Sequence, residues 1–75
     1  MRKARPYWHV FTRAHGLGQY WHHEIGFDNR ADAMAEAQDY SDSGRRTFVW
    51  RTFWGADPAD KCRALNHELV MKGKP

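Results

Sequence analysis

Hydrophobic and polar residues follow two periods along this chain, one typical of strands and one typical of helices. Residues 7–13 and 19–25 are rich in aromatic and β-branched side chains, and the glycines at positions 16 and 18 lie between them. This pattern predicts a β-hairpin. Residues 47–54 are also rich in aromatic and β-branched side chains and predict a third strand.

A first helix is predicted between the second and third strands. Asp28 or Asn29 can cap it, Phe27 can pack back on its first turn, and it runs through a series of alanines to about Tyr40. Its small inner face lets a helix lie close to a sheet. We expect that face to consist of the Arg30 stem, Ala33, Met34, Ala37 and Tyr40 or Ser41.

A second helix is predicted after the third strand, where Asp57 is a capping residue and Pro58 occupies the first helical position. It should run to about Met71 and end at Gly73. Its expected apolar stripe is Cys62, Leu65 and Leu69, and its expected four-apart charge pairs are Asp57 with Lys61 and Glu68 with Lys72.

Together these elements predict one α+β domain over residues 1–75, with a three-stranded antiparallel sheet in ββαβα order. One helix packs on the sheet and the second follows the last strand. Residues 1–5 are expected to form a loose basic N-terminus and residues 72–75 a short tail. Branched aliphatic residues are scarce, so aromatic rings must supply much of the core.

The register of the hairpin decides which rings share a face, because successive side chains of a strand point to opposite faces. We prefer Trp8 opposite His23, which gives the first helix an apolar bed. One face then carries Trp8, Val10, Trp21 and Ile25, and the other carries Tyr7, His9, Phe11, Tyr20, His22 and Glu24. A slip of one residue would instead group Tyr7, Phe11, Trp21 and Ile25, with Trp8, Val10 and Tyr20 opposite.

Either register leaves aromatic residues on the second face of the sheet. One explanation is that the second helix lays Leu65 and Leu69 over part of this face. The other is that the face is partly open and forms a binding surface. That surface would consist of Tyr7, His9, Phe11, Tyr20 and His22.

Charge is divided between separate parts of the chain, although the net charge is only +3. Residues 1–13 carry four basic side chains and no acidic one, and residues 28–42 carry five carboxylates against one arginine. Asp32, Glu36 and Asp39 are expected to form an outward acidic face on the first helix. Such a division concerns partners and encounter rates and not the fold.

The residues that could carry chemistry do not combine into an enzyme. In the preferred register His9, His22 and Glu24 form a two-histidine, one-carboxylate set, but no further histidine or cysteine spacing supports a metal site. Cys62 is the only cysteine, which excludes an intramolecular disulfide and favours a reducing cytoplasm. We expect no enzyme, no metal and no cofactor, and no membrane segment.

Two classes of binding function fit these observations. A wedge with an acidic helix and exposed aromatic and arginine residues suits docking on another protein, or on another copy of the chain. Aromatic residues beside arginines on a small sheet also suit direct nucleic-acid binding. The candidate binding residues are Tyr7, His9, Phe11, Arg13, Tyr20, His22, Arg45, Arg46 and Arg51.

The chain also resembles two groups of very small ββαβ proteins over residues 7 to about 53. The resemblance is carried by Tyr7-Trp8-His9-Val10, Tyr20-Trp21, the capped alanine-rich segment from Phe27 to Ala37, and Thr47-Phe48-Val49-Trp50-Arg51. One group consists of short uncharacterised bacterial domains. The other consists of phage proteins that inhibit host machinery, including inhibitors of bacterial RNA polymerase and some anti-CRISPR proteins.

This resemblance implies a non-enzymatic phage or mobile-element inhibitor that occludes a host protein or ribonucleoprotein machine in the bacterial cytoplasm. In the polymerase inhibitors, arginines on the last strand contribute to binding, and Arg51 is the matching position here. The residue two positions later is Phe53 and not a second arginine. The helix after Asp57 is an addition to the ββαβ unit.

Overall fold

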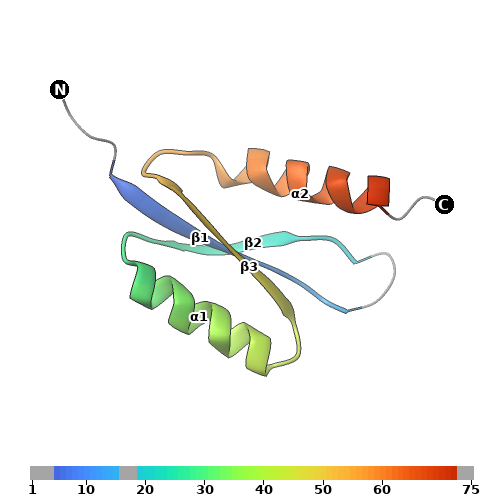
Figure 1. Cartoon of the computed structure of the whole chain (residues 1–75), viewed down its shortest axis with the longest axis horizontal. Coiled ribbons are helices and arrows are strands. Elements are labelled where there is room, and N and C mark those ends of the chain that lie inside the picture. Colours follow the sequence, from blue (N-terminus) through green and yellow to red (C-terminus); the bar gives the residue numbers. More distant parts are fainter. Residues whose placement is uncertain (1–4, 16–18, 73–75) are drawn as a thin grey trace.

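A computed structural model describes residues 5–15 and 19–72, and its helices lie on opposite sides of a three-stranded sheet (Figure 1). The elements are β1 (Pro6–Arg13), β2 (His22–Phe27), α1 (Arg30–Asp42), β3 (Arg46–Phe53) and α2 (Pro58–Lys72). The predicted α+β class and ββαβα order are therefore confirmed. The glycines of the expected turn and most of the expected loose ends lie outside the described residues.

The sheet has the order β2-β1-β3, so the first strand lies in the centre and both pairs are antiparallel. β1 and β3 pair without interruption from Pro6 opposite Phe53 to Arg13 opposite Arg46. The pairing of β1 with β2 shifts between Val10 and Phe11. Val10 lies opposite Ile25 and Phe11 opposite His23, so the residue between them, Glu24, is an extra residue in a β-bulge.

The predicted hairpin register is wrong. Trp8 lies opposite Phe27 and not opposite His23, because the second strand begins at His22 and runs on to Phe27. The bulge reverses the alternation of side chains along β2. His22 consequently pairs with Thr12 and lies on the face opposite to that of His9 and Phe11. We had expected His22 on the same face as His9 and Phe11.

The small face of α1 covers one side of the sheet. Val10 and Ala33 are fully buried and Ala37 nearly so, and Trp8, Phe27, Tyr40 and Val49 pack against this cluster. Asn29 is the capping residue, since its side chain accepts hydrogen bonds from the backbone N–H groups of Ala31 and Asp32 at 2.7 and 3.2 Å. Met34 was predicted to face inward but is 44% exposed.

The other side of the sheet carries a continuous group of aromatic and imidazole rings beneath α2. Phe11 is fully buried and His9 is 7% exposed, so of the two explanations given for this face, the open binding surface is wrong for these two residues. Ring centroids of His9 and Trp50 are 5.8 Å apart, and those of Phe11 and Phe48 are 6.3 Å apart. Stacked and tilted contacts of this kind stabilise a core that is poor in aliphatic residues.

α2 is attached to the sheet by polar contacts as well as by its predicted stripe. Asn66 accepts from the backbone N–H of Trp21 at 2.6 Å and donates to its carbonyl oxygen at 3.2 Å, and the Cys62 thiol donates to the same carbonyl at 3.1 Å. Cys62, Leu65 and Leu69 are half-buried. Two tryptophan backbone groups that precede β2 are thereby satisfied by the helix.

The charged residues of α2 follow the prediction only in part. Glu68 and Lys72 form the expected ion pair at 3.2 Å. Asp57 caps the helix by accepting from the backbone N–H of Ala59 at 2.9 Å. Lys61, which was expected to pair with Asp57, instead places its ammonium group over the rings of Phe48 and Trp50, at 5.5 and 5.6 Å from their centroids.

Candidate nucleic-acid interface

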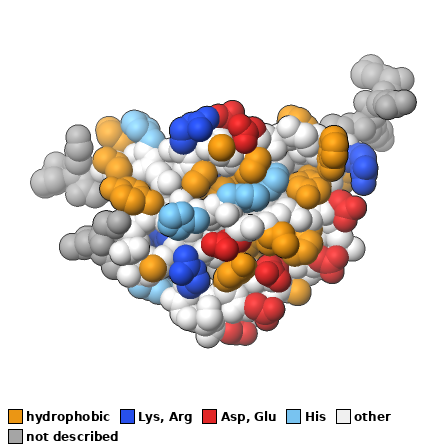
Figure 2. All heavy atoms as spheres, turned by 180° about the vertical axis from the view of Figure 1, so that it is seen from behind, with side chains coloured by type: hydrophobic (Ala, Val, Ile, Leu, Met, Phe, Trp, Pro, Cys, Tyr) orange, Lys and Arg blue, Asp and Glu red, His pale blue; other side chains and the backbone are white. Residues whose placement is uncertain are grey.

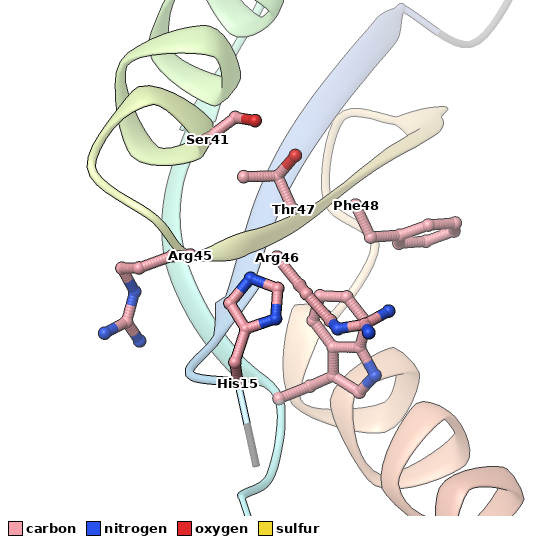
Figure 3. Close-up of a pocket in the computed structure, with 7 residues that line it drawn as sticks. His15, Ser41, Arg45, Arg46, Thr47 and Phe48 are labelled. Carbon is pink, nitrogen blue, oxygen red and sulfur yellow. The ribbon is translucent and has the colours of Figure 1, made fainter.

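A hollow of about 540 Å³ lies where β1 ends and β3 begins (Figure 3). In the view of Figure 3 the imidazole of His15 lies between the side chains of Arg45 and Arg46. The full lining is His15, Trp21, Ser41, Arg45, Arg46, Thr47 and Phe48. These residues come from the hairpin, the last turn of α1 and the start of β3, so only the folded chain brings them together.

Two arginines meet at this end of the sheet. Arg13 and Arg46 are direct cross-strand partners on the same face of the β1–β3 pair. Opposite residues of an antiparallel pair have Cβ atoms about 4.5–5.5 Å apart, and like charges in this position destabilise the sheet. Neither guanidinium forms an ion pair with a carboxylate of residues 5–15 or 19–72.

The head group of Arg13 is held beside the hollow and is incompletely satisfied. Its guanidinium carbon lies 5.4 Å from the centroid of the Trp21 ring, which lines the hollow. Its Nε is buried and has no hydrogen-bond partner among the described residues. A buried donor without an acceptor is costly, so an anion that supplied an acceptor here would stabilise the folded chain.

Arg45 is fixed at the same end by a polar network on the α1 side. Its Nε donates to the Thr12 hydroxyl at 3.1 Å, and this fully buried hydroxyl donates to the Glu24 carboxylate at 2.9 Å. The hydroxyl of Tyr40 donates to the other oxygen of Glu24 at 3.2 Å. Partial burial and the neighbouring Glu24 carboxylate raise the pKa of Tyr40, which keeps its hydroxyl protonated as a donor.

The remaining lining supplies neutral donors and apolar walls. Ser41 and Thr47 contribute hydroxyl groups on one side of β3. In Figure 3 the Phe48 ring projects from the opposite side of that strand. The rings of Trp21 and Phe48 meet edge to face, with centroids 6.3 Å apart. Guanidinium groups, hydroxyls and aromatic walls are the groups that recognise phosphates and bases of nucleic acids.

The structure places Arg13, Arg45 and Arg46 of the predicted binding residues at one end of the sheet and separates the others from them. Arg51 is exposed further along β3, with its guanidinium carbon 5.9 Å from the centroid of the Trp8 ring. Tyr20 is 47% exposed and precedes Trp21 in the chain. His22 is exposed on β2, Tyr7 is half-buried, and His9 and Phe11 lie in the buried ring group.

The three residues considered as metal ligands, His9, His22 and Glu24, do not converge on one site. The Nδ1 of His9 lies 2.9 Å from the Nε2 of His23, whereas Glu24 bonds to Thr12 and Tyr40 on the α1 side. Burial lowers the pKa of both His9 and His23, and mutual repulsion lowers that of His9 further. Within the part of the chain that the structure describes, no group of three or more metal-binding side chains occurs.

Acidic side chains gather away from the hollow. Asp32 and Asp39 are exposed and Glu36 is half-buried, and Figure 2 shows carboxylates concentrated over the part of the surface where α1 lies. The predicted acidic face of this helix is therefore present. The folded molecule has a basic end and an acidic flank, as the charge distribution predicted.

Sequence reasoning did not single out His15, Trp21, Ser41, Thr47 or Phe48 as binding residues. Their common property is position at the junction of three elements, which becomes visible only when the β1–β3 register is known. The Arg45–Arg46 pair after Gly44 was the available signal. Gly44 has a φ of 92° and lets the chain turn sharply from α1 into β3, which places both arginines at the hollow.

Comparison with models of protein families, with curated proteins and with solved structures found no match for this chain. The resemblance to phage inhibitors and short bacterial domains stays a prediction. The described helices include none that is long and apolar enough to cross a membrane.

Proposed function

We propose that this chain is a non-enzymatic nucleic-acid-binding module whose contact site is the basic hollow. The observation that carries the proposal is the direct cross-strand placement of Arg13 and Arg46 without a carboxylate partner among the described residues. Two opposed guanidinium groups repel each other, and a phosphate bound between them would convert that repulsion into two charge-assisted contacts.

The surroundings of this pair fit a nucleic acid better than a simple anion. On the α1 side of the same hollow, Arg45 adds a third guanidinium, and Ser41 and Thr47 add hydroxyl donors. Tyr20 is exposed beside this end and offers a ring for a base, and stacking of this kind contributes about 1–3 kcal/mol per base. The acidic flank on α1 limits the contact to a short stretch of backbone.

The proposal is tested by fluorescence anisotropy with labelled single-stranded and duplex oligonucleotides over a salt series. The logarithm of the binding constant should fall linearly with the logarithm of the salt concentration, with a slope near −0.7 per phosphate contact for single strands and −0.9 for duplex. Two to three contacts are expected from Arg13, Arg45 and Arg46. Affinity that is independent of salt would overturn the proposal.

A pair of variants makes the test specific to the hollow. Arg46→Gln should weaken binding to all sequences and reduce the salt slope by about one contact. Arg51→Gln removes the same charge from the same strand at a distance from the hollow and should have a much smaller effect. Equal losses for the two variants would mean that general charge and not this site drives binding.

Docking on a host protein, the function that the resemblance implies, is favoured by a different observation. Phe53 and Trp54 are 52% and 62% exposed at the opposite end of β3 from the hollow, and Arg51 is close to them in sequence. Tryptophan and arginine dominate the binding energy of protein interfaces. An inhibitor of a polymerase or CRISPR effector would use this end of the molecule.

The two functions are separated by affinity purification from a bacterial lysate with and without nuclease. A specific protein that survives nuclease and is lost with Trp54→Ala, but not with Arg46→Gln, would support docking. A partner that disappears on nuclease treatment would support direct nucleic-acid binding.

A further inference from the structure

The two edges of the sheet are protected to very different degrees. β2 is short, contains the bulge at Glu24 and carries Gly26, and its exposed residues include histidines and a carboxylate. These are features that prevent a sheet edge from pairing with another chain. β3 forms the other edge, and it has eight residues, pairs with β1 in continuous register and contains no glycine, proline, lysine or carboxylate.

Within the described residues no strand pairs with the outer side of β3 (Figure 1). Its sequence, Arg-Thr-Phe-Val-Trp-Arg-Thr-Phe, consists of two arginines and residues that favour strands. A long, regular edge of this composition is a template for a further strand. The partner that completes it must therefore present an extended backbone.

The flank of α1 beside this edge carries the exposed Met34 side chain. Ser41 lines the hollow together with Thr47 of β3, so this side of the helix faces the β3 edge. Met34 precedes Ser41 by seven residues, which is two helical turns, so it lies on the same side, and it is 44% exposed. The Tyr40 hydroxyl bonds to Glu24 of β2, so this side of α1 faces β2. Glu36 lies one helical turn before Tyr40 and therefore on the same side of the helix. The acidic row is thus turned away from β3.

A second copy of β3 meets this edge without a clash of charges. Two copies related by a twofold axis normal to the sheet pair antiparallel, and opposed residues then lie on the same face of the sheet. Arg46 and Arg51 project from opposite faces because their positions differ by an odd number. Symmetric pairing can therefore never place Arg46 of one copy opposite Arg51 of the other.

Pairing centred on Val49 also matches the remaining side chains. Phe48 of each copy then lies opposite Trp50 of the other, which is a favourable aromatic cross-strand pair. Val49 packs against the cluster that contains Ala33 and Ala37, so the axis passes beside the middle of α1. The two exposed Met34 side chains would face each other across it.

We propose that β3 pairs antiparallel with β3 of a second copy, centred on Val49, to form a continuous six-stranded sheet. This interface shares Arg46, Thr47 and Phe48 with the edge of the basic hollow, but its formation does not depend on nucleic-acid binding. It leaves the acidic rows of both copies on the outside. It also gives the seven-residue overlap 46–52 a complete set of backbone partners.

Sedimentation velocity between about 5 µM and 1 mM tests the proposal, with a monomer of 8.8 kDa expected to convert to a species of twice that mass. Hydrogen exchange should show that alternate backbone amides of β3 become protected as concentration rises, while those of β2 do not. Met34→Glu should weaken the dimer at least tenfold by placing two carboxylates at the axis. Met71→Glu, at a methionine 56% exposed on α2, is the matched control.

A cross-linking experiment fixes the register. In a Cys62→Ser background, Val49→Cys should form an intermolecular disulfide on mild oxidation, because opposed α-carbons about 4.5–5.5 Å apart are within disulfide range. Ile25→Cys, on the other edge strand, should not. A monomer at every concentration, equal cross-linking at both positions, or unchanged exchange of the β3 amides would each overturn the proposal.

Discussion

Replacing Arg46 with glutamate should stabilise the folded chain while it removes the proposed nucleic-acid binding. Arg13 and Arg46 are opposed across the β1–β3 pair, and the substitution turns a like-charge pair into an ion pair. A cross-strand pair is worth about 0.2–1 kcal/mol in either direction, so the reversal amounts to about 0.4–2 kcal/mol. Arg46 is exposed and solvent screens it, which places the gain in the lower half of that range.

The expected gain can be measured as a shift of the melting temperature. For a domain of this size, about 1 kcal/mol shifts the midpoint by roughly 4–8 °C, so Arg46→Glu should raise it by a few degrees in low salt. The gain should shrink in about 1 M salt, where the Debye length falls to about 3 Å. Circular dichroism melts at the two salt concentrations provide the measurement.

Arg51→Glu is the matched control for this prediction. It changes the same charge on the same strand, but Arg51 lies over the Trp8 ring and opposite Trp8 in the sheet, so no like-charge pair is relieved. We expect no stabilisation, since a cation–π contact worth about 0.5–1 kcal/mol is lost. If both variants raised the melting temperature equally, or if the gain of Arg46→Glu persisted in high salt, the repulsion argued for the hollow would be refuted.

Three further predictions concern the ring group and the polar network. His9 and His23 have lowered pKa values, so the unfolded chain takes up protons below its ordinary pKa of 6.5 while the folded chain does not. The contribution of these two histidines to the free energy of unfolding should therefore be fully present above pH 6.5 and fall as the pH decreases through and below that value. Chemical denaturation at pH 7.5 and 5.5 measures the loss. Gly26→Ala should cost about 1–3 kcal/mol, because a Cβ there would lie 2.5 Å from a ring carbon of Tyr7, and the cost should shrink in a Tyr7→Ala background. Thr12→Val keeps the buried shape but removes the hydroxyl between two charged groups, so we expect a loss of about 1–3 kcal/mol in denaturant melts, and a smaller loss for Thr12→Ser.

The elements of this fold could be read from local signals, but the face assignment of β2 could not. Asn29 and Asp57 begin their helices by accepting hydrogen bonds from backbone N–H groups two residues later in the chain. Both partners lie within a short stretch of sequence, so these helix starts can be predicted locally. The bulge at Glu24 depends on bonds to Thr12 and Tyr40, which lie in other elements. A single extra residue reverses the alternation of the strand, so a tertiary contact decided which face His22 and His23 occupy.

The candidate site was predictable in composition and not in arrangement. Arg13, Arg45 and Arg46 were all expected to bind a partner, because they stand beside aromatic residues in basic parts of the chain. Their meeting depends on the register of β1 with β3, and both β2 and α1 separate those strands in sequence. Nothing local specifies that Arg13 faces Arg46, and Trp21 is held near them by Asn66 of α2.

Both proposed interfaces lie where the chain departs from the rules that stabilise an isolated sheet. An arginine opposite an arginine destabilises a strand pair, and an unprotected eight-residue edge exposes the chain to association. The core does not require either feature, because Val10, Ala33 and Ala37 are buried on the α1 side and the rings on the other. A threonine at position 46 or a lysine within β3 would satisfy the local rules. Local conflicts that the packing does not explain are expected at functional sites, and in this molecule they mark the hollow and the β3 edge.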